Sequence, residues 1–329
     1  MALVGPTASG KSALALDVAV RLNEGPARPR DGRPPPVELV SVDSMAVYRG
    51  MNIGTAKPTA EVRSRVPYHL VDLVDPSEEF TVQQFQRAAR EALHDIAGRG
   101  SAALLVGGTG LYLRSVVDDL AFPGRYPEVA AGLIAEVDRA GHEGTAARRE
   151  VLEGMHRRLA GMDPVAAGRI EPANERRLVR ALEVTVGSGR PFSSFGPGLE
   201  QYPPSRVTLV GWDPRPEDLD DRIAERFEDL MEQGLLEEVR GLAARPGGLS
   251  RTARQALGYR ELLAHIDEGL PLDRAVALAI GRTRTFARRQ RAWFRRDPRI
   301  VWLDRCDDPV GAIVAALGKV PEASEGVGE

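Results

Sequence analysis

The chain has 329 residues, a formal net charge of -3 at pH 7 and one cysteine, Cys306. This length suits a main domain with an insertion or a second, smaller domain, and a single cysteine excludes a disulfide framework and fits the reducing cytoplasm. No apolar run approaches the roughly 18 residues of a membrane span, and Lys11 lies too near the first residue for a secretory signal to precede the fold, so we expect a soluble, cytoplasmic protein.

The first 110 residues alternate predicted strands with predicted helices. Apolar strands are predicted over residues 2–4, 37–43 and 69–75 and in the segment AALLVGGTG, and a helix is predicted directly after residue 10. A loop rich in Pro, Arg and Gly occupies residues 25–36. A second helix follows Thr81, with a capping-box spacing to Gln84 and an apolar stripe formed by Phe85, Ala89, Leu93 and Ile96. This alternation predicts a parallel sheet covered by helices on both faces.

The strand pattern stops between about Leu120 and Pro204. The segment is polar and helical in pattern, so residues 120–203 are predicted to form an inserted helical domain. Strands resume over residues 206–213 and 299–304, separated by an amphipathic segment with one apolar face, formed by Ile223, Phe227, Leu230, Met231, Leu235 and Val239. The core domain is therefore predicted from residues 1–119 and 204–318, with a disordered tail over 319–329.

A phosphate-binding loop stands between the first strand and the first helix. It matches the pattern G-x-x-x-x-G-K-[ST] and consists of Gly5, Pro6, Thr7, Ala8, Ser9, Gly10, Lys11 and Ser12. Backbone N–H groups and the helix N-terminus favour phosphate oxygens here, Lys11 reaches the outer phosphate, and the Ser12 hydroxyl can bind Mg²⁺. The chain has only three lysines among 44 basic residues (Lys11, Lys57 and Lys319), which favours a specific role for the ammonium of Lys11.

The loop alone does not identify the molecule that carries the phosphates. A kinase or nucleotide hydrolase is the usual owner, and it requires a strand that ends in an acidic residue. The fourth predicted strand ends in glycines instead, whereas Asp43 follows the second predicted strand and is compatible with that role. Asp43 also begins an unusual string, DSMAVYRGMNIGTAKP, which combines apolar residues with Gly-Thr-Ala-Lys.

Six strings in order resemble those of the tRNA dimethylallyltransferases, the isopentenyl-transfer enzymes that modify an adenosine beside the anticodon. They are GPTASGKS, DSMAVYRGMNIGTAKP, LLVGGTGLYL, ERRLVRALEV, ALGYRE and RTFARRQRAWFRR, and they extend from residue 3 to about residue 303. The resemblance implies an α/β fold with a P-loop-type parallel sheet flanked by helices and an inserted helical domain. It also implies that the loop holds the diphosphate of dimethylallyl diphosphate, which leaves rather than being transferred.

The resemblance also assigns roles in catalysis. Asp43 corresponds to the base that accepts a proton from the N6 amine of adenosine, and Thr109 hydrogen-bonds near the reacting centre. Arg222 is the expected cation that joins Lys11 and Mg²⁺ in neutralising the departing diphosphate, although an exposed helical arginine is the alternative from local pattern alone. Local pattern likewise allows Thr109 to be an ordinary helix cap. Because the adenine must leave its stack, the enzyme is expected to flip the base.

A basic segment over residues 281–296 is the predicted RNA contact. It contains seven arginines and no acidic residue, so phosphate binding is favoured over a solvated helix face. Gln290 is a candidate reader of a base edge. The family resemblance adds the stretches 176–180 and 255–260, the first of which would make the insert a mobile clamp. The full set of predicted tRNA contacts is Asp43, Ser44, Met45, Ala46, Arg176, Arg177, Arg180, Gln255, Gly258, Tyr259, Arg260, Arg288, Arg289, Gln290, Trp293 and Arg295.

Three positions depart from the family pattern, and all concern details of binding. Ser12 stands where threonine is commoner, Ala46 where glutamine is common, and Ala130 where arginine is common, a loss for which Arg125 is the candidate replacement. A small-molecule kinase that uses ATP and a non-catalytic RNA-binding protein are the rival hypotheses. The scattered histidines lack metal-ligand spacing, so no zinc site is expected, and a monomer bound to the tRNA anticodon stem-loop is the predicted working form.

Overall fold

A computed structural model describes residues 1–24, 36–196, 198–303 and 307–317 of the chain. The predicted loop over residues 25–36 falls outside the described residues except for its last position, and Asp304, Cys306, Lys319 and the predicted tail over 319–329 also lie outside them. Two compact units are present. One is built from described residues of Met1–Asp119 and Pro203–Glu329, and the other comprises Leu120–Tyr202.

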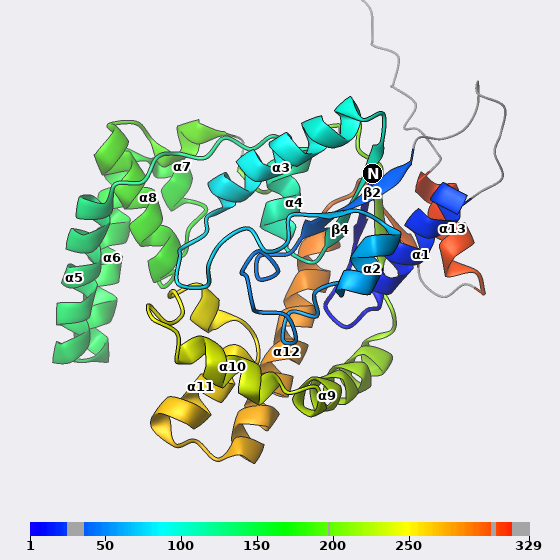
Figure 1. Cartoon of the computed structure of the whole chain (residues 1–329). Coiled ribbons are helices and arrows are strands. Elements are labelled where there is room, and N and C mark those ends of the chain that lie inside the picture. The colour runs from blue at the N-terminus through cyan, green and yellow to red at the C-terminus, as the bar shows by residue number, and fades with distance from the viewer. Residues whose placement is uncertain (25–35, 197, 304–306, 318–329) are drawn as a thin grey trace, which may run out of the picture. The chain divides into compact units, whose positions relative to one another are not determined.

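The first unit is built on a sheet of six parallel strands (Figure 1). Their order across the sheet is β3-β2-β4-β1-β5-β6. In chain order the strands are β1 (Ala2–Val4), β2 (Val37–Val42), β3 (Tyr68–His69), β4 (Ala102–Gly107), β5 (Leu209–Trp212) and β6 (Ile300–Leu303). The last residues of β1, β2 and β4 are in register, since Gly107 is paired with both Val4 and Val42. The residues that follow these three strands therefore meet at one edge of the sheet.

Helices cover both faces of this sheet. Leu3, Leu39 and Leu104 pack into one core with α1 (Lys11–Glu24) and α13 (Pro309–Leu317). On the opposite face, Val4 and Val42 belong to a larger core to which the next helices contribute, namely α3 (Val82–Gly98), α4 (Gly110–Val117) and α12 (Leu272–Phe294). Near-continuous apolar strands are the sequence form of a sheet buried on both faces, and that prediction is confirmed.

The predicted capping box begins α3. The Thr81 hydroxyl accepts a hydrogen bond from the Gln84 N–H at 3.2 Å, and the Gln84 side chain accepts one from the Thr81 N–H at 2.8 Å. Phe85 and Ile96 on the predicted apolar stripe are fully or almost fully buried against the sheet. Because two N–H groups at the helix start are satisfied reciprocally, the helix begins where the sequence indicates.

Two predicted elements differ from the structure. The strand expected over residues 69–75 is wrong, because Leu70 and Asp72 have φ angles of 62° and 57°, which end the extended conformation after β3. Only Val74 makes a further bridge, to Tyr48. The amphipathic segment after β5 forms two helices, since Gly234 adopts a left-handed φ of 94° between them. These helices are α9 (Pro216–Glu232) and α10 (Leu235–Ala243).

The remaining elements of the first unit are short helical segments. They are α2 (Ala60–Arg65), η2 (Ala253–Gln255) and α11 (Tyr259–Glu268). Among the described residues, the second unit contains helical elements and no strand: α5 (Pro127–Glu143), α6 (Thr145–Met162), α7 (Pro164–Ala167), α8 (Glu175–Ser188) and η1 (Phe192–Phe195). Its core includes Leu133, Leu159 and Leu178. No helix over the described part of the chain combines the length and apolarity that a membrane span needs.

Candidate active site

The phosphate loop connects β1 to α1 at the carboxyl edge of the sheet. Ala8 and Gly10 have positive φ values of 60° and 83°, which curl the backbone in the manner of an anion-binding loop. The indole N–H of Trp212, at the end of β5, donates a hydrogen bond to the Ser9 carbonyl at 2.9 Å. A Cβ at Gly5 would lie 2.3 Å from the Trp212 carbonyl oxygen, so only glycine allows this close approach. The loop is therefore held by the neighbouring strand.

Asp43 and Thr109 lie on the loops that follow β2 and β4. The Thr109 hydroxyl accepts a hydrogen bond from the Ser44 N–H at 3.2 Å, and the Thr109 N–H donates to the Val42 carbonyl at 3.3 Å. Thr109 makes no side-chain cap on α4, which removes the simple capping role as its explanation. Gly107 permits this contact, because a Cβ there would lie 2.0 Å from the Val42 carbonyl oxygen. The structure thus brings Asp43 and Thr109 onto adjoining loops.

The Asp43 carboxylate is oriented by its own turn. One oxygen, Oδ1, accepts hydrogen bonds from the N–H groups of Met45 at 2.8 Å and Ala46 at 3.3 Å. The other oxygen, Oδ2, has no hydrogen-bond partner within the described ranges, and the side chain is partly exposed. A carboxylate held by one oxygen and open at the other is suited to accept a proton from a bound molecule.

The charges of Lys11 and Asp43 act on each other across this edge. Burial lowers the pKa of Lys11 to about 8, an effect that the negative charge of Asp43 opposes and the positive charge of Arg226 reinforces. The Lys11 ammonium donates a hydrogen bond to the Pro6 carbonyl of the same loop at 3.0 Å. Asp43 and the phosphate loop therefore lie on the same side of the sheet edge, which the predicted chemistry requires.

Arg226 replaces Arg222 as the arginine of this site. Both residues are on α9, one turn apart, but Arg222 is exposed while Arg226 is partly buried. Burial lowers the pKa of Arg226, and Asp43 raises it, so Arg226 is the guanidinium that faces the site. The assignment of Arg222 was wrong because two arginines separated by one turn share a helix face and are equivalent by periodicity. Each arginine is followed by a buried apolar residue, Ile223 or Phe227, so the local sequence carries no signal that distinguishes them.

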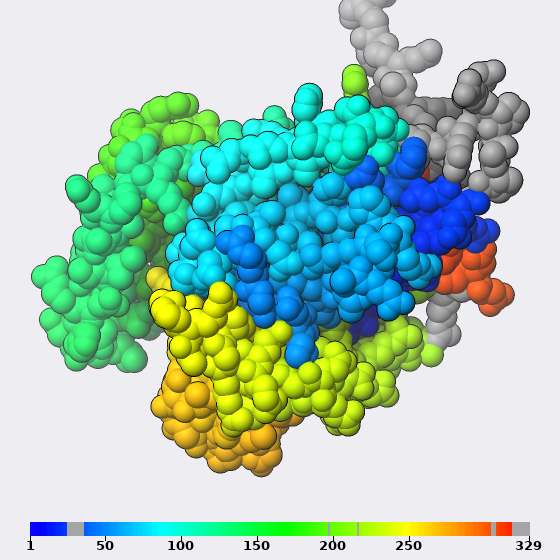
Figure 2. Space-filling view, viewed as in Figure 1, coloured from blue at the N-terminus to red at the C-terminus, as the bar shows by residue number. Residues whose placement is uncertain are grey.

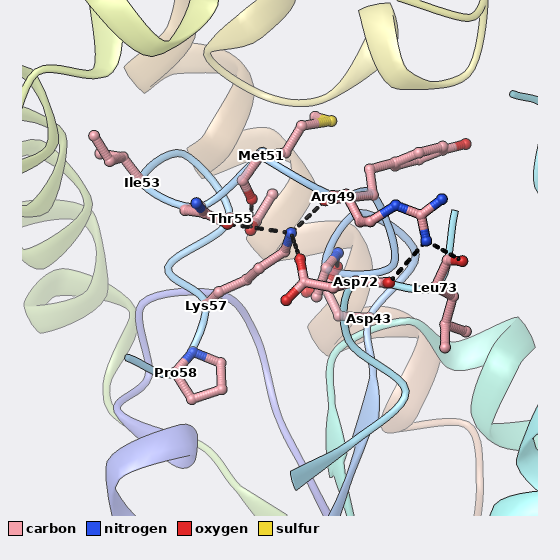
Figure 3. Close-up of polar contacts among 12 residues, drawn as sticks. Asp43, Arg49, Met51, Ile53, Thr55, Lys57, Pro58, Asp72 and Leu73 are labelled. Atoms are coloured by element: carbon pink, nitrogen blue, oxygen red, sulfur yellow. Dashed lines mark hydrogen bonds and ion pairs between the residues drawn. The ribbon is translucent and has the colours of Figure 1, made fainter. Parts of the chain in front are cut away.

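The string after Asp43 folds into a loop that Lys57 holds from inside (Figure 3). The Lys57 ammonium is bonded to Asp72 Oδ1 at 2.7 Å and to the Tyr48 carbonyl, and its side chain is only 2% exposed. Arg63 contacts the other oxygen of Asp72 at 2.8 Å. Burial would raise the pKa of Asp72, but Lys57 and Arg63 together keep that pKa below its usual value. Lys57 therefore has a structural role that its rarity alone did not identify.

Glu238 on α10 holds the same loop from outside. Its carboxylate accepts hydrogen bonds from the N–H groups of Asn52, Ile53 and Gly54 at 2.8, 2.8 and 3.2 Å, and from the Tyr259 hydroxyl at 2.5 Å. Figure 2 shows this loop in blue at the surface, directly against the yellow residues of α10. Glu238 is a positioning residue that sequence reasoning missed, because its partners are far away along the chain.

Tyr259 and Gly258 are not available for the predicted RNA contact. Tyr259 is fully buried. Its ring packs against Gly54 so closely that a Cβ added at Gly54 would lie 2.3 Å from the ring. Gly258 is also buried and has a left-handed φ of 83°. By contrast, Gln255 and Arg260 are exposed and contact each other at 3.2 Å. The stretch 255–260 is thus divided into a buried half that supports the loop and an exposed half that is open to a partner.

Four of the seven arginines over residues 281–296 are paired with acidic residues from other segments, contrary to the expectation of an unbalanced run. Glu261 pairs with Arg282 at 2.5 Å, and Asp213 pairs with Arg291 and Arg295 at 2.6 and 2.7 Å. The weaker pair between Asp220 and Arg288, at 3.6 Å, is exposed. Within the described ranges, Arg289 and Arg296 are exposed and have no ion-pair partner. The open positive charge is therefore smaller than the count of seven arginines suggested.

Gln290 and Trp293 point inward from α12. Gln290 is 8% exposed, and its amide contacts the phosphate loop and the residue before Thr109. Trp293 packs on Gly110, where a Cβ would lie 2.1 Å from the indole nitrogen. The predicted base-reading role of Gln290 is wrong for this structure, since both ends of its amide already have protein partners.

Some of the predicted tRNA contacts on the second unit and in the loop after Asp43 are exposed, whereas others are not. On α8, Arg176 and Arg177 are exposed. Arg180 instead pairs with Glu183 at 2.7 Å and donates to the carbonyls of Pro123 and Gly124 within the same unit. After Asp43, the residues Ser44 and Met45 are partly exposed and Ala46 is buried.

The chain is similar to known proteins in both sequence and structure. The family model described as IPP transferase matches residues 46–297. A tRNA dimethylallyltransferase of Desulforudis audaxviator is 40% identical over 97% of both chains, and one of Kineococcus radiotolerans is 44% identical over 98% of this chain and 97% of its own. The solved tRNA isopentenylpyrophosphate transferase of Bacillus halodurans is 34% identical, with a TM-score of 0.65 over 95% of this chain and 93% of its own.

Proposed function

This chain belongs to the IPP transferase family, and from that premise we propose that it transfers the dimethylallyl group of dimethylallyl diphosphate to N6 of the adenosine at position 37 of tRNA, releasing diphosphate. One observation carries the proposal: a phosphate loop and a partly free carboxylate meet at one sheet edge, where Asp43 and Lys11 act on each other electrostatically. The kinase alternative is set aside, because the relatives over nearly the whole chain are prenyl-group transferases.

The electrophile must lose its diphosphate leaving group. The bond between the allylic C1 and the diphosphate oxygen breaks, its electron pair remains on diphosphate, and negative charge accumulates there. The N–H groups of the loop, the Lys11 ammonium and the Arg226 guanidinium are the groups placed to neutralise that charge. Because Trp212 holds the loop backbone before the substrate binds, the N–H groups of the loop reorganise little during the reaction.

Mg²⁺ is the proposed cofactor, and the residues present fit it. Mg²⁺ usually keeps several waters and takes one or two protein oxygens plus phosphate oxygens, so a dedicated cluster of acids is unnecessary. Ser12 lies in the first turn of α1 and is exposed, and its hydroxyl has no hydrogen-bond partner within the described ranges. Ser12 would hold the ion, which when bound adds positive charge beside the diphosphate.

On the nucleophile's side, the amine must lose a proton as it gains a carbon. The new bond forms between N6 and the allylic carbon, and the proton of N6 passes to Asp43 and then to solvent. Oδ2 of Asp43 is the acceptor in this step, since Oδ1 is already held by the N–H groups of Met45 and Ala46. The Thr109 hydroxyl supports the reacting centre from the next loop. The adenine reaches these groups only after it leaves the anticodon stack.

The proposed RNA contacts are exposed or partly exposed residues. On the first unit they are Ser44 and Met45, which are partly exposed, and the exposed residues Gln255, Arg260, Arg288, Arg289, Arg295 and Arg296. On the insert they are the exposed pair Arg176 and Arg177. Arginines bind the phosphate backbone of RNA through charge and planar hydrogen bonds. We propose that the partner segment is the anticodon stem-loop and that a monomer suffices, because every proposed catalytic group comes from one chain. A tRNA substrate and a single cysteine suit the cytoplasm.

The direct test is prenyl transfer to RNA. The protein is incubated with Mg²⁺, an anticodon stem-loop RNA and dimethylallyl diphosphate labelled in the allyl group, and the label is measured in the RNA. We expect label on the RNA, one diphosphate released per transfer, and no label when the target adenosine is replaced by guanosine. ATP in place of dimethylallyl diphosphate serves as the control for phosphate transfer. Phosphorylation of a product, with no prenyl transfer, would overturn the proposal.

A further inference from the structure

Gln290 connects two loops that are far apart in the sequence. It lies on α12, and its amide oxygen accepts a hydrogen bond from the Thr7 N–H of the phosphate loop at 2.8 Å. Its amide nitrogen donates to the Gly108 carbonyl, directly before Thr109, also at 2.8 Å. One side chain thus joins the loop after β1 to the loop after β4.

The fit around this amide is close. A Cβ at Gly108 would lie 2.3 Å from the Gln290 amide nitrogen, so glycine is required there while Gln290 is present. Gly108 does not have a positive φ angle, so its backbone conformation would allow a side chain. The contact with Gln290 is what excludes one. The second glycine of the GGTG string is explained by a glutamine about 180 residues later in the chain.

The Thr7 N–H has consequences for anion binding. Successive N–H groups of such a loop bind phosphate only if the backbone holds them in a common direction. The bond from Thr7 to Gln290 directs one N–H of the loop toward α12, which constrains the directions of the next N–H groups. Gln290 is only 8% exposed, so water has little access to replace this hydrogen bond.

We propose that Gln290 is a positioning residue, which holds the diphosphate loop and the Thr109 loop in their working geometry and does not read an RNA base. The inference rests on the proposed function for the identity of the ligand. The neighbouring residue on the same helix, Arg289, is exposed and faces a different environment. A single helix therefore carries an RNA-facing arginine next to an inward-facing residue that shapes the diphosphate site.

The first experiment separates the two substrates. For Gln290→Ala, we expect the Kd for inorganic diphosphate and the KM for dimethylallyl diphosphate to rise roughly 10- to 100-fold, because a buried N–H and a buried carbonyl lose their partner. The Kd for the anticodon stem-loop RNA should change less than about twofold. Arg289→Ala is the matched control and should weaken RNA binding while leaving diphosphate binding nearly unchanged. Gln233→Ala, which removes an exposed glutamine at the C-cap of α9, should change neither. Weaker RNA binding with unchanged diphosphate binding in Gln290→Ala would overturn the proposal.

A second variant keeps the test decisive if Gln290→Ala is unstable. Gln290→Glu conserves the shape, but its ionised carboxylate cannot donate to the Gly108 carbonyl. Burial raises the pKa of such a carboxyl, and the protonated form, present below that pKa, restores both hydrogen bonds. Diphosphate binding by Gln290→Glu, expressed relative to wild type at each pH, should therefore improve as the pH falls. A ratio that stays flat between pH 8 and pH 5 would contradict the proposal, since a purely space-filling role does not depend on protonation.

The contact with Gly108 provides an independent cycle. Gly108→Ala should weaken diphosphate binding in the wild-type background, because its Cβ displaces the amide, and should weaken it less in Gln290→Ala, where the Gly5 carbonyl oxygen at 3.2 Å remains the nearest of the neighbouring atoms. Additive effects would show that the two residues do not act together. Failure of the proposed function is distinguishable: it would appear as wild-type protein that binds diphosphate but transfers no prenyl group, whatever the variants do.

Discussion

Lys11 and Asp43 interact electrostatically at the edge of the sheet, although they belong to loops after different strands. The first binds the leaving group and the second accepts the proton in the proposed reaction. Their proximity means that a change in the charge of one residue is felt by the other. The protonation of Lys11 is therefore the first property to test.

We expect binding of dimethylallyl diphosphate to weaken above pH 8. The pKa of Lys11 in the free protein is lowered by burial to about 8, so the ammonium loses its charge as the pH rises through that value. A bound diphosphate favours the charged form, and binding then requires proton uptake, which reduces affinity by up to about tenfold per pH unit above the pKa. Calorimetric Kd values between pH 6.5 and 10 measure this effect. Lys11→Met should bind more weakly at pH 7 and lose the pH dependence; an equal slope in both proteins would contradict the assignment.

Arg226→Ala should raise the KM for dimethylallyl diphosphate by roughly 10- to 100-fold, the cost of removing a charged hydrogen-bond partner from an anion. Arg222→Ala is the matched control one turn earlier on α9, where the side chain is exposed, and should change this KM by less than about threefold. Steady-state kinetics with saturating RNA make the comparison. If Arg222→Ala had the larger effect, the position of Arg226 would not be functional.

Asp43→Asn should reduce kcat by roughly 100- to 10,000-fold, the usual contribution of a positioned general base. The amide keeps the acceptor for the Met45 N–H but cannot take a proton, so RNA binding should be nearly unchanged. Single-turnover transfer and a separate RNA titration measure the two effects. Equal losses of transfer and RNA binding would indicate that Asp43 acts through the fold of its loop.

Glu238→Ala should lower the free energy of unfolding by about 1–3 kcal/mol, because three N–H groups and the buried Tyr259 hydroxyl lose their acceptor. It should also lower kcat more than it weakens diphosphate binding, since the loop that carries Asp43 is loosened while the phosphate loop keeps its contact with Trp212. Urea unfolding and steady-state kinetics are the measurements. Glu238→Gln, which retains an acceptor oxygen, should lie between wild type and alanine in both.

The local features of this protein were predicted from the sequence because short-range patterns encode them. The phosphate loop follows from its own eight residues, the start of α3 from a capping box, and the parallel sheet from apolar strands alternating with helices. Once the sheet is parallel, residues after neighbouring strands must share one edge, so the meeting of Asp43 with the phosphate loop also followed from sequence.

The directions in which individual side chains point were not predicted from the sequence. Periodicity left Arg222 and Arg226 equivalent, and Gln290 was predicted to read a base edge although its side chain is buried. The seven arginines over residues 281–296 also overstated the free positive charge, since Asp213, directly after β5, pairs with both Arg291 and Arg295.

The sequence by itself determined which chemistry is present and at which edge of a sheet it lies, since motif spacing and strand order are local or topological properties. Tertiary structure decided which arginine faces Asp43, which cations stay open to solvent and where Gln290 points. The physical reason is separation: Thr7 and Gln290 are 283 residues apart, and their contact depends on how α12 packs against the loop after β4, where Gly108 leaves room for the Gln290 amide. No pattern in either segment encodes the other's position.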